Sequence, residues 1–192
     1  MDEWLSDLLA AIAAGDDRQA EEAVERLDRL GDAALPALQA LLSSAEREHR
    51  WWAVRALAVV GTAEAVAALI AVLGDPDPDV RACAVVALAE LRPAEAVEPL
   101  VVRLDDPSAY VARLAADALA QFGDAAVEPL IRTLREGGVA ARAGAARALR
   151  ALQSPQAIPA LCAALDDPSA VVTAYAEEAL ERMGVGLVFF SP

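Results

Sequence analysis

The sequence predicts an all-α fold in which two-helix repeats stack side by side as an α-solenoid. Leucine recurs at one place in a motif, 30 or 31 residues apart, at Leu27, Leu57, Leu88, Leu119, Leu149 and Leu180. A second leucine keeps this interval half a repeat later, at Leu42, Leu73, Leu104, Leu134 and Leu165. Hydrophobic residues make up 57% of the chain and aromatic residues only 4%, so Ala, Leu and Val dominate, which favours closely packed helices. A fixed period with two periodic segments in each unit is typical of a repeat array.

The fourth unit, residues 105–134, shows why each repeat is expected to be a helical hairpin. It opens with Asp-Asp-Pro-Ser, which predicts a turn followed by a helix N-cap. Helical spacing then relates the apolar residues Val111, Leu114, Ala115, Ala118, Leu119 and Phe122. Gly123 is a stop signal, and Pro129 is expected in the first turn of a second helix. The apolar face of that helix holds Val127, Leu130, Ile131 and Leu134.

The same pattern divides residues 1–192 into the consecutive elements of one domain. An amphipathic helix over 1–14, with Trp4 and Leu8 on its apolar side, is expected to cap the array. Two-helix repeats follow at 15–43, 44–74, 75–104, 105–134 and 135–165, and a last helix is expected at 166–183. The tail at 184–192 is apolar and too short for a partner helix. We expect it either to fold back over the last helix or to mediate self-association.

Several short motifs recur at fixed places in these units. Asp-Pro stands at the first turn, Val-Arg opens the first helix, Ala-Leu lies near its end, and AVEPL opens the second helix at 96–100 and 126–130. This unit resembles the short HEAT-like repeats that are named after phycobilisome lyases. The resemblance implies a right-handed α-α superhelix, in which the first helix of each repeat lies on the convex side and the second lines the concave side.

The charge of the chain argues against polyanionic partners. The formal net charge is −14, and all 16 basic residues are arginine. Because a field of this sign repels phosphate, we expect neither nucleic acid nor an anionic membrane surface as a partner. The absence of Lys and Asn indicates the GC-rich codon usage of a bacterial gene.

We expect a cytoplasmic protein. The start, MDEWLSDLL, lacks the basic region of a secretory signal. The apolar stretch 56–74 resembles a short membrane span, but Gly61-Thr62 interrupts it at the place of the turn within a repeat. Cys83 and Cys162 fall on apolar helical positions and are interpreted as buried, reduced thiols.

The sequence offers no catalytic, cofactor-binding or metal-binding constellation, so we do not expect an enzyme. His49 is the single histidine, which removes any two-histidine metal site. It occupies a core position of the repeat, where a half-buried structural histidine is expected. No glycine-rich phosphate loop occurs, and Gly137-Gly138 is interpreted as a turn between repeats.

Candidate partner-binding residues lie on the outward positions of the second helices. They form a mixed-charge, net acidic ladder of Glu64, Glu95, Glu98, Arg103, Glu128, Arg132 and Gln156. Toward both ends the ladder holds small apolar residues, Ala33, Ala40, Ala71 and Ala163. The alternative is that these are ordinary solvated charges, with Glu128 and Arg132 paired as i, i+4 neighbours.

Two further features depart from the repeat pattern. Trp52 matches core positions of the other units, whereas Trp51 is expected to point outward, as an interface anchor or as a cover for the junction with the first repeat. In the fifth unit, Arg135, Arg142, Arg147 and Arg150 have a single nearby acid, Glu136. That patch either meets an acidic partner or is a solvated face.

These observations predict a non-enzymatic scaffold that binds a protein or peptide on the concave face of a HEAT-like solenoid. The alternative is an accessory or lyase-like subunit that holds a tetrapyrrole chromophore for a client protein. That alternative rests on the resemblance alone.

Overall fold

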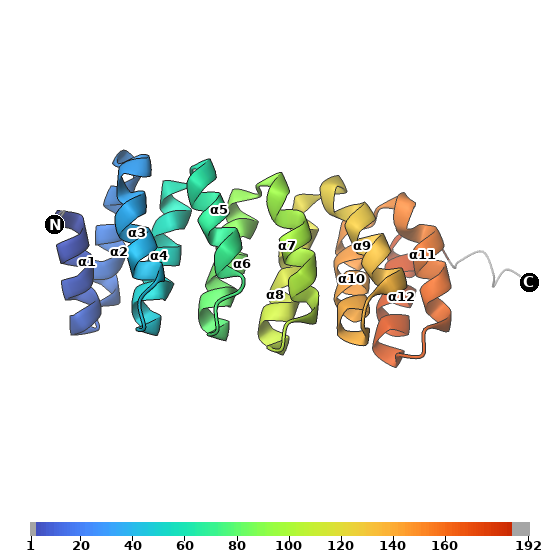
Figure 1. Cartoon of the computed structure of the whole chain (residues 1–192). Helices are drawn as coiled ribbons and strands as arrows, with labels where there is room; N and C mark the ends of the chain where they lie inside the picture. The colour runs from blue at the N-terminus through green and yellow to red at the C-terminus, as the bar shows by residue number, and fades with distance from the viewer. Residues whose placement is uncertain (1–2, 186–192) are drawn as a thin grey trace, which may run out of the picture. The chain divides into compact units, whose positions relative to one another are not determined.

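The computed structural model describes residues 3–185, apart from the side chains of residues 28 and 29, and every regular element in that range is helical (Figure 1). This confirms the all-α prediction. The chain forms two compact units, one ending at Leu91 and the other beginning at Arg92. The boundary falls inside the predicted 75–104 repeat, between its two helices.

The first unit consists of two layers of helices with a further helix at one end. Its α-helices are α1 (Glu3–Ala14), α2 (Asp17–Glu25), α3 (Leu35–Leu42), α4 (Arg47–Val60), α5 (Ala63–Val72) and α6 (Pro78–Leu91). The A layer contains α2, α4 and α6, and the B layer contains α3 and α5 (Figure 1). Because α1 packs against α2, it covers the first hairpin.

The second unit repeats the two-layer arrangement. Its α-helices are α7 (Val97–Val102), α8 (Ala109–Leu119), α9 (Asp124–Glu136), α10 (Val139–Leu152), α11 (Ile158–Ala163) and α12 (Ala170–Arg182). Here α8, α10 and α12 form the A layer, and α7, α9 and α11 form the B layer. Since α9 begins at Asp124, Pro129 lies beyond its first turn, contrary to the prediction.

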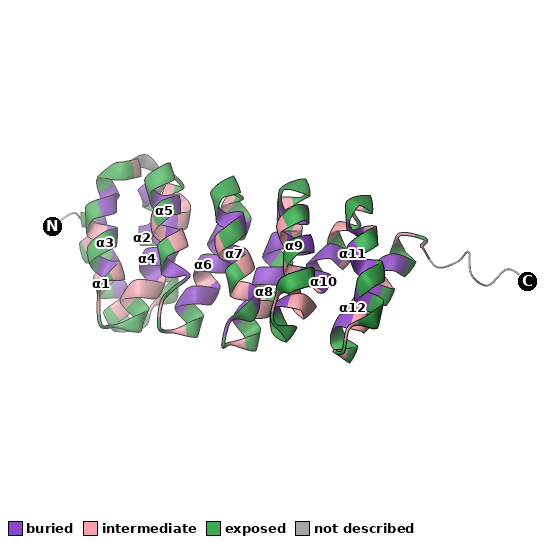
Figure 2. Ribbon diagram, turned by 45° about the vertical axis from the view of Figure 1, so that its right-hand side comes forward, coloured by how far each residue is buried: buried purple, intermediate pink, exposed green. Residues whose placement is uncertain are grey.

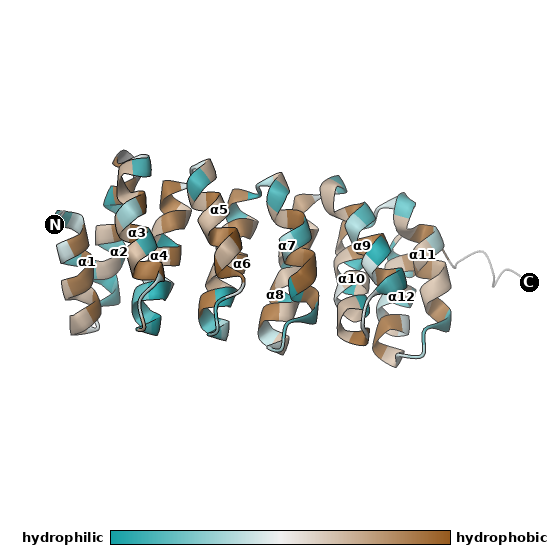
Figure 3. Cartoon of the chain, in the orientation of Figure 1, coloured by the Kyte–Doolittle hydropathy of each residue, from teal (hydrophilic) through white to brown (hydrophobic). Residues whose placement is uncertain are grey.

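The periodic leucines fill the space between the layers of each unit. In the first series, Leu27, Leu57, Leu88, Leu119 and Leu149 have no exposed surface and Leu180 is 5% exposed. Buried residues face the neighbouring helices, and in α6 they extend around most of the helix (Figure 2). Hydrophilic residues gather in the turns that join successive hairpins (Figure 3). The second series ends at Leu165, which is 39% exposed. Burial of the first leucine series therefore contributes to the stability of both units.

Each A-layer helix is followed by a residue whose backbone has a positive φ. It follows four residues after each leucine of the first series, at Gly31, Gly61, Arg92, Gly123, Gln153 and Gly184. Glycine adopts this conformation without a Cβ clash, whereas Arg92 (φ 50°) and Gln153 (φ 51°) adopt it at a cost. The backbone is therefore strained at both residues.

In some repeats, an arginine of the A-layer helix forms hydrogen bonds both to the turn before its own helix and to an aspartate in the turn of the next hairpin. Arg142 donates to the Gly137 carbonyl at 2.9 Å and to Asp167 through Nε (2.8 Å) and Nη2 (3.1 Å). Arg50 makes the equivalent bonds to Asp75, at 2.8 and 3.1 Å. One repeat before Arg142 and Asp167, the corresponding positions hold Ala112 and Gly137, so both members of the pair are replaced together.

Local geometry decides two of the sequence interpretations. Gly61 (φ 60°) ends α4 and Thr62 caps α5, so the apolar stretch 56–74 is a hairpin. No helix within residues 3–185 is long and apolar enough to cross a membrane. The predictions made for the tail at 184–192 lie outside the described residues, which end with Val185.

Candidate functional site

The predicted ladder lies on the B layer, and its members are available to solvent. Glu64 belongs to the first unit; Glu95, Glu98, Glu128, Arg132 and Gln156 belong to the second, and all six are exposed. Arg103 is half-buried and contacts the buried Asp106, with Nη1 at 3.4 Å from the carboxylate. The small residues Ala33, Ala40, Ala71 and Ala163 are exposed too.

Within the second unit, the structure brings Glu98 and Arg132 together. Arg132 Nη2 lies 2.7 and 2.8 Å from the two carboxylate oxygens of Glu98, which raises the pKa of the guanidinium. The ion pair therefore joins α7 to α9, and Arg132 pairs with Glu98 of the preceding repeat although Glu128 is its i, i+4 neighbour. With Arg132 engaged by Glu98, Glu95 and Glu128 remain as exposed acids on this face.

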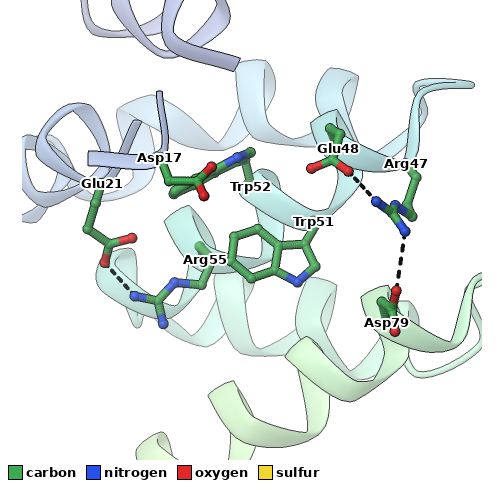
Figure 4. A pocket seen from close by; sticks show the side chains of 8 residues that line it. All are labelled: Asp17, Glu21, Arg47, Glu48, Trp51, Trp52, Arg55 and Asp79. Carbon is green, nitrogen blue, oxygen red and sulfur yellow. Dashed lines mark hydrogen bonds and ion pairs between the residues drawn. The ribbon is translucent and has the colours of Figure 1, made fainter. Parts of the chain in front are cut away.

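The first unit contains a pocket on its A layer around the two adjacent tryptophans. Its volume is about 420 Å³, and its lining side chains are Asp17, Glu21, Arg47, Glu48, Trp51, Trp52, Arg55 and Asp79 (Figure 4). They come from α2, α4 and α6. Trp52 is 4% exposed, which confirms its core position, whereas Trp51 is half-buried and its ring lies among the charged side chains (Figure 4). The two rings meet edge to face, with centroids 5.0 Å apart.

Ion pairs occupy both arginines of this pocket. Arg47 contacts Glu48 and, at 3.2 Å, Asp79, and Arg55 pairs with Glu21 (Figure 4). Four carboxylates stand against two guanidinium groups, so the lining carries two net negative charges. The structure records no ion pair for Asp17 with any of the described residues. Trp51 was identified from the sequence, but three of the four acids come from α2 and α6, whose approach to Trp51 the repeat pattern alone does not fix.

The sequence analysis assigned a single nearby acid to the four arginines of the fifth unit, and this prediction is wrong. Arg147 binds Asp117 through Nε (2.9 Å) and Nη2 (3.1 Å), and Arg150 pairs with Glu178 and covers the Tyr175 ring at 5.1 Å. Together with Arg142, these arginines are bound by acids of neighbouring hairpins. Of the four, Arg135 is the one without an ion pair among the described residues.

A second pocket lies in the second unit, and sequence reasoning missed it. Its volume is about 440 Å³, and it lies between the end of α9, α10 and the turn after α11. The lining includes Arg135, the Arg142–Asp167 pair, Asp166 and Ala163. Since Ala163 is also a ladder position, this pocket opens beside the predicted partner-binding face.

The histidine and the two cysteines do not form a reactive or metal-binding site among the described residues. His49 is half-buried, with Nδ1 3.0 Å from the Ser44 hydroxyl, which confirms the structural interpretation. Cys83 is half-buried, and burial raises its pKa to about 12, but Cys162 is exposed, so the prediction that both thiols are buried is wrong for Cys162. No group of three His, Cys, Asp or Glu side chains within the described part of the chain is placed to hold a metal ion.

Two-layer stacks of helical hairpins, tied by arginines from one repeat to the next, define the chain as an α-solenoid. It belongs to the HEAT repeat family, whose model matches residues 34–107 and 97–181. A comparison with curated proteins found no match.

A comparison with solved structures found similar chains. The complex of CpcE and CpcF of phycocyanin lyase from Nostoc sp. PCC7120 is 28% identical, with a TM-score of 0.54 over 79% of this chain and 65% of that chain. An engineered protein is 26% identical, with a TM-score of 0.47 over 96% and 97%. A designed armadillo repeat protein, solved in complex with the peptide (KR)4, is 23% identical, with a TM-score of 0.48 over 95% and 100%.

Proposed function

We propose that the chain is a non-enzymatic scaffold that binds a protein or peptide on its B layer, the face that the family resemblance expects to be concave. The observation that carries this proposal is the exposure of Glu64, Glu95 and Glu128 on helices whose other side forms the core. These three acids contribute little to packing, so their carboxylates can contact a partner. Glu64, Glu95 and Glu128 make that face acidic, which favours a partner with basic or mixed-charge contacts.

The proposal includes a cytoplasmic location and excludes nucleic acid and membrane surfaces as partners. The net charge of −14 supports both exclusions, because phosphate-bearing surfaces would be repelled. Most of the charged residues of the ladder are glutamates. Its two arginines already form ion pairs, Arg132 with Glu98 and Arg103 with Asp106.

Affinity capture with paired variants tests the ladder. The variant E95R/E128R reverses the two exposed acids of the second unit, whereas E98R/R132E exchanges the members of an ion pair and keeps the net charge. A partner is first identified by mass spectrometry and then purified. We expect it to bind the parent and the exchange variant but not E95R/E128R. A control variant, E177R/E181R on α12, changes the net charge equally away from the B layer and should bind normally. If the purified partner binds E95R/E128R as tightly as the parent, the ladder does not contact it.

The similarity to the phycocyanin lyase complex supports a second candidate, an accessory or lyase-like subunit that holds a tetrapyrrole for a client protein. Expression together with a tetrapyrrole supply distinguishes the two functions. A scaffold is expected to purify colourless, whereas a visible absorption band that co-purifies with the chain would favour the second candidate.

A further inference from the structure

The pocket around Trp51 has the components of a site for a flat organic cation. An aromatic ring lies among carboxylates, and the net charge of the lining is negative. The faces of indole rings attract cations, most strongly where the surroundings are partly dry. Trp51 is half-buried, and its neighbour Trp52 is buried beneath the pocket, so the aromatic side chain is held in place.

The ion pairs already present show which group is free to receive a ligand. Arg47 is held by Glu48 and Asp79, and Arg55 is held by Glu21, so three of the four acids are engaged. Asp17, at the start of α2, has no ion pair among the described residues and lies beside the tryptophans (Figure 4). The pocket thus combines an aromatic ring with one unengaged carboxylate.

We propose that this pocket binds the guanidinium group of an arginine in a partner peptide, with Trp51 as the stacking surface and Asp17 as the anion. A guanidinium group is planar and donates in a fork, so it stacks on a ring while it binds a carboxylate. An ammonium group is a compact point charge and gains less from this arrangement. The volume of about 420 Å³ is within the range of sites for small ligands and side chains.

This site is independent of the proposed ladder. Its residues belong to α2, α4 and α6 of the A layer, whereas the ladder occupies the B layer. The scaffold proposal therefore stands or fails on the ladder variants, and the arginine site stands or fails on variants of Trp51 and Asp17.

The test is a titration followed by the indole N–H signals of the ¹⁵N-labelled full chain. The chain has three tryptophans, Trp4, Trp51 and Trp52, so three signals are expected, and the variant W51F identifies that of Trp51. The probe is the blocked peptide Gly-Gly-Arg-Gly-Gly, with citrulline and lysine versions as controls. One side chain supports only weak affinity, a Kd of about a millimolar. We expect the arginine peptide to shift the Trp51 signal saturably and to leave Trp4 unchanged.

Variants separate this site from the general field of an acidic protein. W51A should weaken binding of the arginine peptide roughly five- to thirtyfold, as expected for loss of a partly desolvated cation–π contact. D17N should weaken it about fivefold, whereas E25Q, which removes an equal charge from an exposed position of the same helix, should leave it unchanged. Circular dichroism checks that each variant is folded.

Three results would overturn the proposal. Equal binding of the citrulline peptide would show that charge is not recognised, and equal binding of the lysine peptide would show that guanidinium is not selected. Equal weakening by D17N and E25Q would assign the effect to the net charge of the protein. The ladder variant E95R/E128R should bind the arginine peptide like the parent, since it leaves the pocket residues unchanged.

Discussion

Arg142 and Asp167 form a two-point ion pair between the start of α10 and the turn after α11, with donor–acceptor distances of 2.8 and 3.1 Å. The same guanidinium donates to the Gly137 carbonyl at 2.9 Å. One side chain thus holds three segments of the second unit together. Side-chain exposures of 16% for Arg142 and 10% for Asp167 distinguish this pair from surface pairs such as Arg18–Glu22, at 75% and 50%.

Loss of this arginine is expected to destabilise the chain. Arg142→Ala leaves the shielded Asp167 carboxylate and the Gly137 carbonyl with fewer partners, and unsatisfied groups of this kind cost more than an exposed pair contributes. The midpoint of urea unfolding should fall clearly, whereas Arg18→Ala should leave it nearly unchanged. Equal midpoints for the two variants would mean that the pair is no more than a surface contact.

The same pair predicts a loss of stability in acid. The hydrogen bond from Arg142 holds the pKa of Asp167 below its ordinary value of 3.8, and Arg150 lowers the pKa of Glu178 in the same way. A carboxylate with a lowered folded pKa contributes stability that is fully present above its unfolded pKa and is lost as the pH falls through its folded pKa. Unfolding midpoints measured from pH 6 down to pH 2 should therefore decline below about pH 4.

A variant checks the assignment of this acid effect. Asp167→Asn should be less stable than the parent near neutral pH and should show a shallower decline below about pH 4. Parallel pH profiles for the parent and the variant would exclude Asp167 as a source of the decline.

The two cysteines are expected to differ in reactivity. Burial raises the pKa of Cys83 to about 12, so almost none of it is thiolate at pH 8, whereas Cys162 is exposed. A disulfide reagent should therefore modify one thiol rapidly in the folded chain and the second only after urea is added. Cys162→Ser should abolish the rapid phase, and a rapid phase that persists would show that Cys83 is accessible.

Adjacent glycines between α9 and α10 should respond differently to alanine. A Cβ on Gly137 would lie 2.7 Å from the Thr133 carbonyl oxygen, whereas a Cβ on Gly138 meets nothing closer than the Asp105 carboxylate at 3.6 Å. We expect Gly137→Ala to lower the free energy of unfolding by about 1–3 kcal/mol through this clash. Gly138→Ala should change it by less than about 0.5 kcal/mol. A similar effect of both would contradict the backbone clash.

Strain at Gln153 should be removable. This residue has φ 51° at a place where Gly61 has φ 60°. Gln153→Gly is expected to raise the free energy of unfolding by about 0.5–1 kcal/mol, and Gly61→Ala to lower it by about 1 kcal/mol. Chemical denaturation measures both. A destabilising effect of Gln153→Gly would mean that the gain in unfolded-chain entropy exceeds the strain.

The sequence was sufficient to predict the hairpins because their signals are local. The helical spacing of apolar residues, Ser108 as an N-cap and Gly61 as a stop each act within a few helical turns. The half-buried His49 and the buried Trp52 were also predicted, since their positions follow from the repeat register.

Partners across repeats were not predictable in the same way. Arg132 has Glu128 as its i, i+4 neighbour, but it reaches Glu98, 34 positions away. Arg147 reaches Asp117, 30 positions away. Such contacts depend on the offset between stacked helices, which the repeat period alone does not specify. The walls of the Trp51 pocket come from three helices for the same reason.

Ala112 and Gly137 have a consequence for the exchange of repeats between positions. Arg142 and Asp167 are replaced one repeat earlier by Ala112 and Gly137, so neither charge is present there. An aspartate at position 137 would place its Cβ against the Thr133 carbonyl oxygen. The units are therefore not interchangeable modules. A chimera that moves one hairpin to another position must carry its following turn with it, and recombination within this array is expected to succeed at boundaries that keep each arginine together with its acid.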